Sequence, residues 1–466
     1  MTDLVDKFSI ENYGPLAVVS NYQMSSAEDN TVKARVDSTE ARIDYKKNFR
    51  SQSTGFGFMA GVDLRETKDK RDATNVTFVS NSNPLTNIGL VPDFSSNNYG
   101  YPVVWIDYNK YAQTVKPGLA INPTTSNNGS SSRDYFYKER ILAGYVSAKY
   151  GTERTNTIAG LRFDKVNFDA QSPLSVAGAF TGRFSPYSGG YDHLLPSITF
   201  AHFLTQGLRV KAAASQSLGR PQFGDIAQAE TRNLTNLTIA RGNSSLQPRQ
   251  ADNYDLTLEY FFAGSGLASV GAFYKNIKDD IYTSSVEEQI DGVTWTVTTP
   301  RNNSASTMRG VEFQVVHDAI PGLPGFLEKR LGASLNYTKL WGEMDYLSGA
   351  TFVHLKALQY QPDWMANATV FYSLPQKKGE IRVSYHWKGH SPISLGASPW
   401  TTYWLRAQER LDVGIRYSLT KRLVVKLQGN NLTSEPVQQG YLDPYAMNRY
   451  EMGRDKTFSL DFTYKL

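Results

Sequence analysis

The stretch TFSLDFTYKL at residues 457–466 alternates apolar and polar side chains without interruption. Phe458 and Leu460 fall on one side of an extended backbone and Ser459 and Asp461 on the other, because successive side chains of a strand point to opposite faces. The same alternation recurs between turn signals along nearly the whole chain, whereas helical periodicity is scarce. The sequence therefore predicts an all-β fold.

Composition agrees with this prediction and excludes several classes of protein. The 28 Tyr, 23 Phe and 7 Trp residues, together with 36 Gly, favour strands and turns. The absence of cysteine excludes a disulfide scaffold, a thiolate metal site and a cysteine nucleophile. A net charge of +5 with no block of Lys and Arg predicts no nucleic-acid partner. Residues 1–19 lack the pattern of a signal peptide.

Fifteen strands are predicted, with approximate cores at 31–45, 55–65, 136–150, 155–168, 192–203, 208–217, 252–262, 268–283, 305–317, 331–343, 364–373, 380–388, 404–418, 422–431 and 453–465. Short turns between them alternate with long connections, which we place at 66–135, 169–191, 218–251, 284–304, 344–363, 389–403 and 432–452. A soluble sandwich also alternates along its strands, so the connection lengths decide between the two folds. Short turns on one rim and long loops on the other indicate a transmembrane antiparallel up-and-down β-barrel.

The polar faces of these strands carry charged residues, which predict the face of the barrel wall that contacts water. Arg382, Lys388 and Arg416 each lie on such a face, and a basic side chain facing mid-bilayer lipid costs about 2–4 kcal/mol. We therefore expect these faces to line a water-filled lumen. The apolar faces end in aromatic residues such as Tyr385 and Trp387, which is typical of the girdles at membrane interfaces.

Residues 218–262 carry a more specific signal, LGRPQFGDIAQ followed by GNSSLQPRQADNYDLTLEYFF. With MRGVEFQ, VKLQGNNLTSEP and the terminal GRDKTFSLDFTYKL, this arrangement resembles the barrel of TonB-dependent outer-membrane receptors. The residues that match the family's motifs are Arg220, Pro221, Gly242, Asn243, Leu246, Pro248, Asn253, Tyr254, Glu259, Gly310, Glu312, Asn430 and Asn431.

The resemblance implies an integral protein of the bacterial outer membrane that takes up a scarce solute, such as a ferric siderophore or an oligosaccharide. Its partners would be outer-membrane lipid, the solute, and TonB with its inner-membrane proton-driven complex. It implies neither an enzyme nor a cofactor. The family barrel has 22 strands around a plug, so we expect residues 31–466 to be its C-terminal part and 1–30 the remnant of an extracellular loop. The chain is then a fragment that lacks the plug and the TonB-contacting segment.

Aromatic and basic residues of the predicted extracellular loops are the candidates for ligand contact. Aromatic rings stack on sugars or on siderophore rings, and a guanidinium pairs with an anionic chelate. The alternative is that the rings pack the loops together and that the arginine pairs with a neighbouring acid. The candidates are Tyr101, Trp105, Tyr108, Arg220, Trp295 and Trp400.

Other functions are weighed against this interpretation. A passive outer-membrane porin or other barrel channel is the main alternative, and a constriction loop inside the lumen would favour it. His386 and His390 are four residues apart, which is the spacing of a helical metal pair, but one lies on a predicted strand and the other in a loop. We therefore predict neither a catalytic residue nor a metal ligand.

Overall fold

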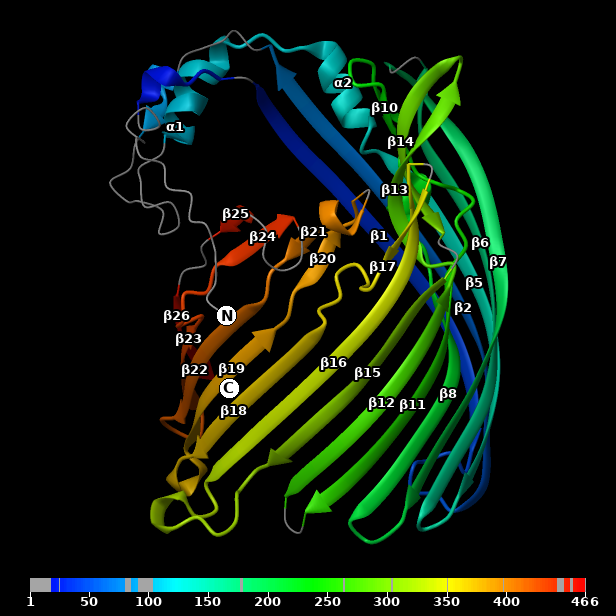
Figure 1. Cartoon of the computed structure of the whole chain (residues 1–466), viewed down its shortest axis with the longest axis vertical. Helices are drawn as coiled ribbons and strands as arrows, with labels where there is room; N and C mark the ends of the chain where they lie inside the picture. The colour runs from blue at the N-terminus through cyan, green and yellow to red at the C-terminus, as the bar shows by residue number, and fades with distance from the viewer. Residues whose placement is uncertain are drawn as a thin grey trace.

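The computed structural model describes residues 18–24, 26–79, 85–90, 104–176, 179–262, 265–302, 305–349, 351–396, 398–441, 448–452 and 456–465. Within these ranges fifteen strands form one antiparallel sheet in chain order, which curls into the wall of a barrel (Figure 1). The strands are β1 (Ala27–Lys47), β2 (Gly55–Phe78), β5 (Tyr135–Gly151), β6 (Thr155–Val176), β7 (Ala179–Phe203), β8 (Leu208–Gly219), β11 (Arg249–Phe262), β12 (Gly266–Lys278), β15 (Ala305–His317), β16 (Leu331–Ser348), β18 (Trp364–Ser373), β19 (Gly379–Lys388), β22 (Gln408–Ser418), β23 (Leu423–Asn430) and β26 (Thr457–Tyr464).

The number and order of these strands confirm the prediction of fifteen. Each strand pairs with its neighbours in the chain order, as an up-and-down barrel requires. One further strand, β17 (Thr351–Leu355), pairs with β16 beside this path. Among the described residues β1 and β26 stand at the two ends of the strand order and do not pair with each other.

Short turns lie at one end of the barrel, and most of the other elements lie at the opposite end (Figure 1). These elements form three small sheets, in the orders β13-β14-β10-β9, β20-β21-β24-β25 and β3-β4. Their strands are β3 (Gly89–Leu90), β4 (Trp105–Ile106), β9 (Thr231–Asn233), β10 (Thr238–Ala240), β13 (Ile281–Ile290), β14 (Val293–Asn302), β20 (Ser391–Ser394), β21 (Tyr403–Leu405), β24 (Val437–Tyr441) and β25 (Asn448–Met452). The helices are α1 (Tyr108–Lys110), α2 (Pro123–Ser131) and α3 (Phe223–Ala227), with short turns of helix η2 (Val19–Asn21), η3 (Leu85–Asn87), η4 (Tyr111–Val115), η5 (Lys116–Gly118), η6 (Gly325–Leu327), η7 (Pro375–Lys377) and η8 (Pro399–Thr401).

None of the described helices is long and apolar enough to cross a membrane.

All seven predicted loops contain strand residues, and two of them are wrong over most of their length. The segment 169–191 continues the β6–β7 hairpin, whose pairing runs up to Val176 opposite Ala179. The segment 284–304 contains most of the β13–β14 hairpin, whose turn is Asp291-Gly292 with φ of 53° and 77°. An Asp-Gly pair with positive φ is the preferred two-residue hairpin turn, so this signal was present in the sequence.

Two predicted strands are also wrong in their extent. The segment 268–283 is interrupted after Lys278, because Asp279 adopts a left-handed φ of 53° and the chain leaves the wall to begin β13. The segment 404–418 is divided between β21, in a rim sheet, and β22, in the wall. In both places one alternating run spans two separate strands, and alternation does not record which neighbour a strand pairs with.

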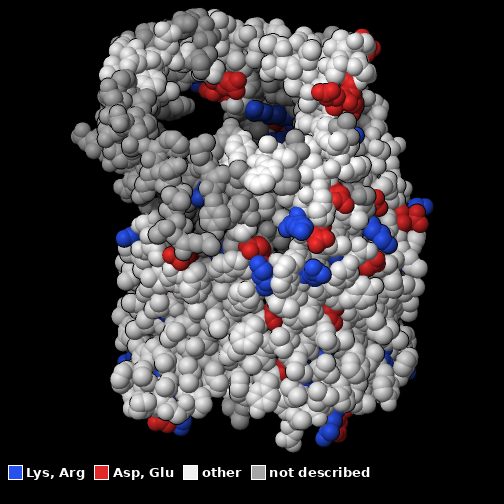
Figure 2. All heavy atoms as spheres, in the orientation of Figure 1, with Lys and Arg blue, Asp and Glu red and all other residues white. Residues whose placement is uncertain are grey.

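Buried apolar side chains concentrate where the rim segments pack on one another and on the upper wall. One cluster joins Tyr137 and Phe168 of the wall to Ile226, Ala227 and Leu246 of the segment between β8 and β11. The outward side chains of β26 are instead exposed, as their lipid-facing side predicts. Figure 2 shows most charged side chains in the upper half of the visible face, with a largely uncharged region below them. The wall thus presents an apolar exterior below a polar rim.

Helix α2 covers the edge of β2 beyond the point where β5 begins. The backbone N–H of Asn75 donates to Ser130 Oγ at 2.8 Å, and that of Thr77 donates to Ser126 Oγ at 2.9 Å. Two residues of a strand advance about 6.7 Å and four residues of a helix about 6 Å, so serines four apart match alternate strand amides. The helix satisfies donors that a neighbouring strand would otherwise bind.

Candidate functional site

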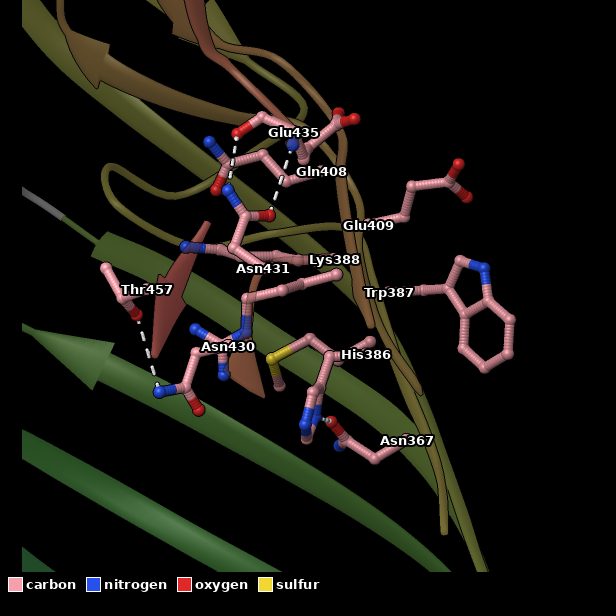
Figure 3. Close-up of a pocket in the computed structure, with 12 residues that line it drawn as sticks. Asn367, His386, Trp387, Lys388, Gln408, Glu409, Asn430, Asn431, Glu435 and Thr457 are labelled. Carbon is pink, nitrogen blue, oxygen red and sulfur yellow. Dashed lines mark hydrogen bonds between the residues drawn. The ribbon is translucent and has the colours of Figure 1, made fainter. Parts of the chain in front are cut away.

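The upper ends of β18, β19, β22, β23 and β26 enclose a cavity of about 590 Å³ (Figure 3). Cross-strand pairing brings its polar residues together, because Asn367 lies opposite His386, His386 opposite Arg410, and Lys388 opposite Gln408. All of these side chains lie on the polar, inward face of the wall, where the alternation of the sequence places them. The cavity is therefore a feature of the lumen wall just below the extracellular rim.

Hydrogen bonds fix the back of this cavity. His386 Nδ1 and Asn367 Oδ1 are 2.6 Å apart, and His386 Nε2 lies 3.5 Å from Asp412 Oδ2. Arg410 donates to the same Asp412 oxygen at 2.9 Å. The other oxygen, Asp412 Oδ1, accepts the backbone N–H of Asn431 at 2.9 Å. Asp412 thus orders three elements of the wall and has both of its oxygens engaged.

Asn431 shapes the edge of the cavity where β23 ends. Its φ is 53°, in the left-handed region that Asn adopts more readily than most residues. Its side-chain oxygen accepts the backbone N–H of Glu435 at 3.1 Å. The neighbouring Asn430 approaches Thr457 Oγ1 of β26 at 3.5 Å. The two Asn residues of this family motif therefore turn the chain out of the wall beside the cavity.

The remaining polar groups divide between the two faces of the wall. Figure 3 shows Trp387 and Glu409 directed away from His386 and Asn367, and the two are paired opposite each other in register. Within the described residues, Lys388 has no ion pair and the Gln408 carboxamide has no hydrogen bond. The lining of the cavity thus includes an ammonium and a carboxamide together with the carboxylates of Glu409 and Glu435.

A second group of motif residues holds the segment between β8 and β11 against the inner wall. Leu246 is 1% exposed within the apolar cluster of Tyr137 and Ile226. Gly242 permits the close approach of this segment, because a Cβ there would lie 2.7 Å from the carbonyl oxygen of Ile226. Asn243 donates from its side chain to the carbonyl of Pro300 at 3.0 Å. Pro221 and Pro248 are buried in the same segment.

Other motif residues lie in the wall. Asn253 accepts a hydrogen bond from Lys275 at 3.0 Å, and Glu259 pairs with Arg209 at 2.6 Å. A Cβ at Gly310 would meet the ring of Phe273. The last two motif residues are Tyr254 and Glu312. Tyr254 is exposed on the outward face, and Glu312 of β15 lies opposite Thr338 of β16.

The candidate ligand residues from the sequence are not brought together. Arg220 pairs with Asp164 at 3.0 Å, and Asp164 also binds Arg162 at 2.6 Å. Trp295 is only 6% exposed, with the Arg232 guanidinium 5.5 Å from its ring centre.

Three of the other four aromatic candidates belong to the rim. Tyr108 and Trp400 are 66% and 70% exposed. Trp105 lies in β4, but its side chain is outside the described residues, as is the whole of Tyr101. The described candidates are therefore divided between paired or buried positions and open positions on separate elements.

Sequence reasoning identified only part of the lumen cavity. It placed Lys388 on the water-facing side of a strand and His386 on the same predicted strand, but it singled out neither Gln408 nor Arg410. The sequence signal that could have identified these two residues is that polar residues stand at the extracellular ends of neighbouring strands. No group of three or more His, Asp and Glu side chains suited to a metal ion occurs in the described part of the chain.

The antiparallel wall, the polar inward face and the elaborated rim define a transmembrane β-barrel of the outer-membrane type. The chain belongs to the TonB-dependent receptor family, because the family described as "TonB dependent receptor-like, beta-barrel" matches residues 6–432. Members of this family are transport proteins of the outer membrane and not enzymes. No curated protein matches the chain.

Solved structures of other proteins share this fold. The ferric yersiniabactin uptake receptor FyuA from Yersinia pestis is 14% identical, with a TM-score of 0.57, and the match covers 94% of this chain and 56% of FyuA. The siderophore receptor PiuA from Acinetobacter baumannii is 12% identical, with a TM-score of 0.60 and coverages of 93% and 56%. The copper transporter OprC is 10% identical, with a TM-score of 0.58 and coverages of 93% and 58%. The chain thus spans a little over half the length of these proteins.

Proposed function

We propose that this chain supplies barrel wall to an outer-membrane receptor that takes up a small solute with energy delivered through TonB. The observation that carries the proposal is the family's barrel with a polar cavity of about 590 Å³ open on its inward face. Ligand sites of small molecules have volumes of about 300–1,000 Å³. The cavity therefore has the size for a solute on its way through the lumen.

The outer-membrane location and the lipid partner belong to the same proposal. Phe458, Leu460 and Phe462 expose 71%, 57% and 66% of their surface on the outward face of β26. Exposed apolar area of this extent is stable against lipid chains and unfavourable in water. We place residues 31–466 in the receptor barrel and residues 1–30 in an extracellular loop that precedes it.

The two ends of the strand order support the proposal that the functional barrel contains further strands. In the described residues β1 pairs only with β2, and β26 only with β23. Backbone groups without partners cost several kcal/mol each in hydrocarbon, so both edges require partners in a membrane. The whole receptor, including a plug and the segment that contacts TonB, is the proposed transporter.

Uptake by whole cells tests the proposed function. Cells that produce the protein are compared with cells that lack its gene, each with and without TonB, for accumulation of labelled ferric siderophores and oligosaccharides. We expect accumulation of one solute to require both the gene and TonB. Accumulation that needs the gene but continues without TonB would favour a passive channel.

A further inference from the structure

Three basic side chains surround one carboxylate on the outward face of β2 and β5. Glu66 Oε1 lies 3.1 Å from the Lys68 ammonium. The other oxygen of Glu66, Oε2, lies 3.2 Å from the Lys138 ammonium and 3.0 Å from Arg140 Nε. One carboxylate balances one of these three cations, so two positive charges remain at this group. We call these four residues the β2–β5 cluster.

The register of the sheet shows where the β2–β5 cluster lies. Its four residues form two direct cross-strand pairs, and the next outward pair below them is Leu64 opposite Leu142. Both leucines are about half exposed, whereas Tyr137 and Glu139, at the alternate positions of β5, are buried on the inner side. Two residues of a strand advance about 6.7 Å. The cations therefore begin one step above lipid-facing leucines, at the depth where headgroups follow the hydrocarbon.

Other outward charges near the cluster mostly occur as opposite pairs. These pairs are Arg35 with Asp37 at 2.8 Å, Lys33 opposite Asp72, and Lys165 opposite Asp192. Outside them, the outward face keeps Asp169, opposite Lys138, and Lys70, one step further up β2. Asp134, near Lys70, accepts a backbone N–H at the edge of the sheet. The excess of cations therefore lies at the cluster itself, around Glu66.

The cluster has the chemistry to bind the phosphate of a lipid. An ammonium has three donors and a guanidinium five, so Glu66 leaves several of them unused. Arg140 and Lys68 expose 58% and 48% of their side chains, which makes these donors accessible from outside the barrel. Charged hydrogen bonds to phosphate oxygens are roughly twice as strong as neutral ones. A lipid with acyl chains against Leu64 and Leu142 would carry its phosphate at the height of these donors.

We propose that the β2–β5 cluster binds the phosphate headgroup of an anionic lipid on the outer surface of the barrel, with Lys68, Lys138 and Arg140 as its contacts. The inference rests on the proposed outer-membrane location, since it names the class of lipid that this face meets. Free phosphate offers the same oxygens, but only a lipid adds apolar contact with Leu64. We commit to the lipid, and the experiment separates the two sources.

Binding of dihexanoyl phosphatidic acid to the full chain, folded in a neutral detergent, tests this proposal by titration calorimetry. We expect saturable binding about tenfold tighter than that of inorganic phosphate or of phosphatidylcholine with the same chains. Replacing both Lys138 and Arg140 by Gln should weaken binding about tenfold or more, since a charge-assisted hydrogen bond contributes on that scale. Glu66→Gln should strengthen binding about two- to fivefold, because it removes a competing carboxylate. These opposite signs distinguish the site from a general loss of structure.

Lys278→Gln is the matched control because Lys278 lies on the outward face of β12, as Tyr274 does, and pairs with Asp252 at 3.6 Å. It should leave the affinity for phosphatidic acid within about twofold. The mobility of unheated samples on gels checks that each variant keeps the barrel. Equal losses in Lys278→Gln and the double variant would overturn the site, as would weaker binding in Glu66→Gln. Equal affinity for phosphatidylcholine or for inorganic phosphate would overturn the lipid assignment.

The two proposals fail in different ways. If phosphatidic acid binds and the double variant weakens it while cellular uptake is independent of TonB, the lipid site stands and the proposed function falls. If uptake requires TonB but phosphatidic acid shows no preference over phosphatidylcholine, the function stands and the lipid site falls.

Discussion

The wall of the barrel and its extracellular rim hold neighbouring segments together in different ways. In the wall, β23 and β26 pair along eight residues, with Leu427 and its outward neighbours on one face and Gln428 and its inward neighbours on the other. In the rim, α2 is held through the hydroxyls of Ser126 and Ser130. We therefore expect the wall to tolerate exchange of residues within one face, and the rim to depend on individual hydrogen-bonding atoms. Each prediction below tests one side of this difference.

The largest expected effect is a charge on the lipid face of the wall. Leu427→Arg should destabilise the folded barrel by about 2–4 kcal/mol, the cost of a basic side chain near the bilayer midplane. Gln428→Arg, on the inward face between Gly414 and Ser459, should have little effect. Urea unfolding in lipid vesicles, followed by the mobility of unheated samples on gels, measures both variants. Similar losses for the two would contradict the assignment of the faces.

This difference explains how much of the fold the sequence predicts. All fifteen wall strands were predicted because their two faces meet different solvents, and the alternation of side chains records this. The upper β6–β7 hairpin was missed because its sequence is rich in Gly, Ser and Pro, which are turn signals, although Ala170 on one of its faces is buried. The Asp291-Gly292 turn was a local signal for β13–β14 that the prediction did not use.

The same limit applies to the functional sites: the pattern of one strand shows which face a residue lies on, but it does not show which residues of other strands lie beside it. The inward position of Lys388 follows from one strand's own pattern, and the structure confirms it. Its proximity to Gln408 depends on the register between β19 and β22, which no single strand encodes. The pairing of Arg220 with Asp164 joins residues 56 positions apart. A motif therefore identifies such residues without showing whether they face a ligand or an acidic partner.

The next effect concerns the close packing of the rim segment between β8 and β11. Gly242→Ala should destabilise this segment by about 1–3 kcal/mol, because the added methyl group meets the backbone around Ile226 and the segment must shift. Gly224→Ala is the matched control, since a Cβ there meets nothing within 4 Å. Hydrogen exchange of residues 223–248 measures the local opening. Unchanged exchange in Gly242→Ala would show that the contact is not required.

A smaller effect is expected for the attachment of α2. Replacing both Ser126 and Ser130 by Ala removes the acceptors of two β2 amides and should cost about 1–2 kcal/mol. Ser131→Ala controls for the higher helix propensity of Ala, because no hydrogen bond of the Ser131 side chain occurs in the described residues. Exchange of the Asn75 and Thr77 amides reports the result. Equal protection in the double variant and the control would mean that the hydroxyls do not hold the helix.

The smallest effect is a pH dependence beside α2. Asp134 Oδ1 accepts the backbone N–H of Ala73 at 2.7 Å, and burial raises the pKa of Asp134 above its ordinary value of 3.8, helped by Asp72 and opposed by this hydrogen bond and by Lys70. The folded state then binds the proton more tightly than the unfolded state, so stability falls as pH rises between the ordinary and the raised pKa. The protection factor of the Ala73 amide should therefore decline slightly across this interval. Asp134→Asn retains an oxygen acceptor but has no proton to lose, so its protection should not vary with pH. A slope that persists in Asp134→Asn would assign the dependence to another group.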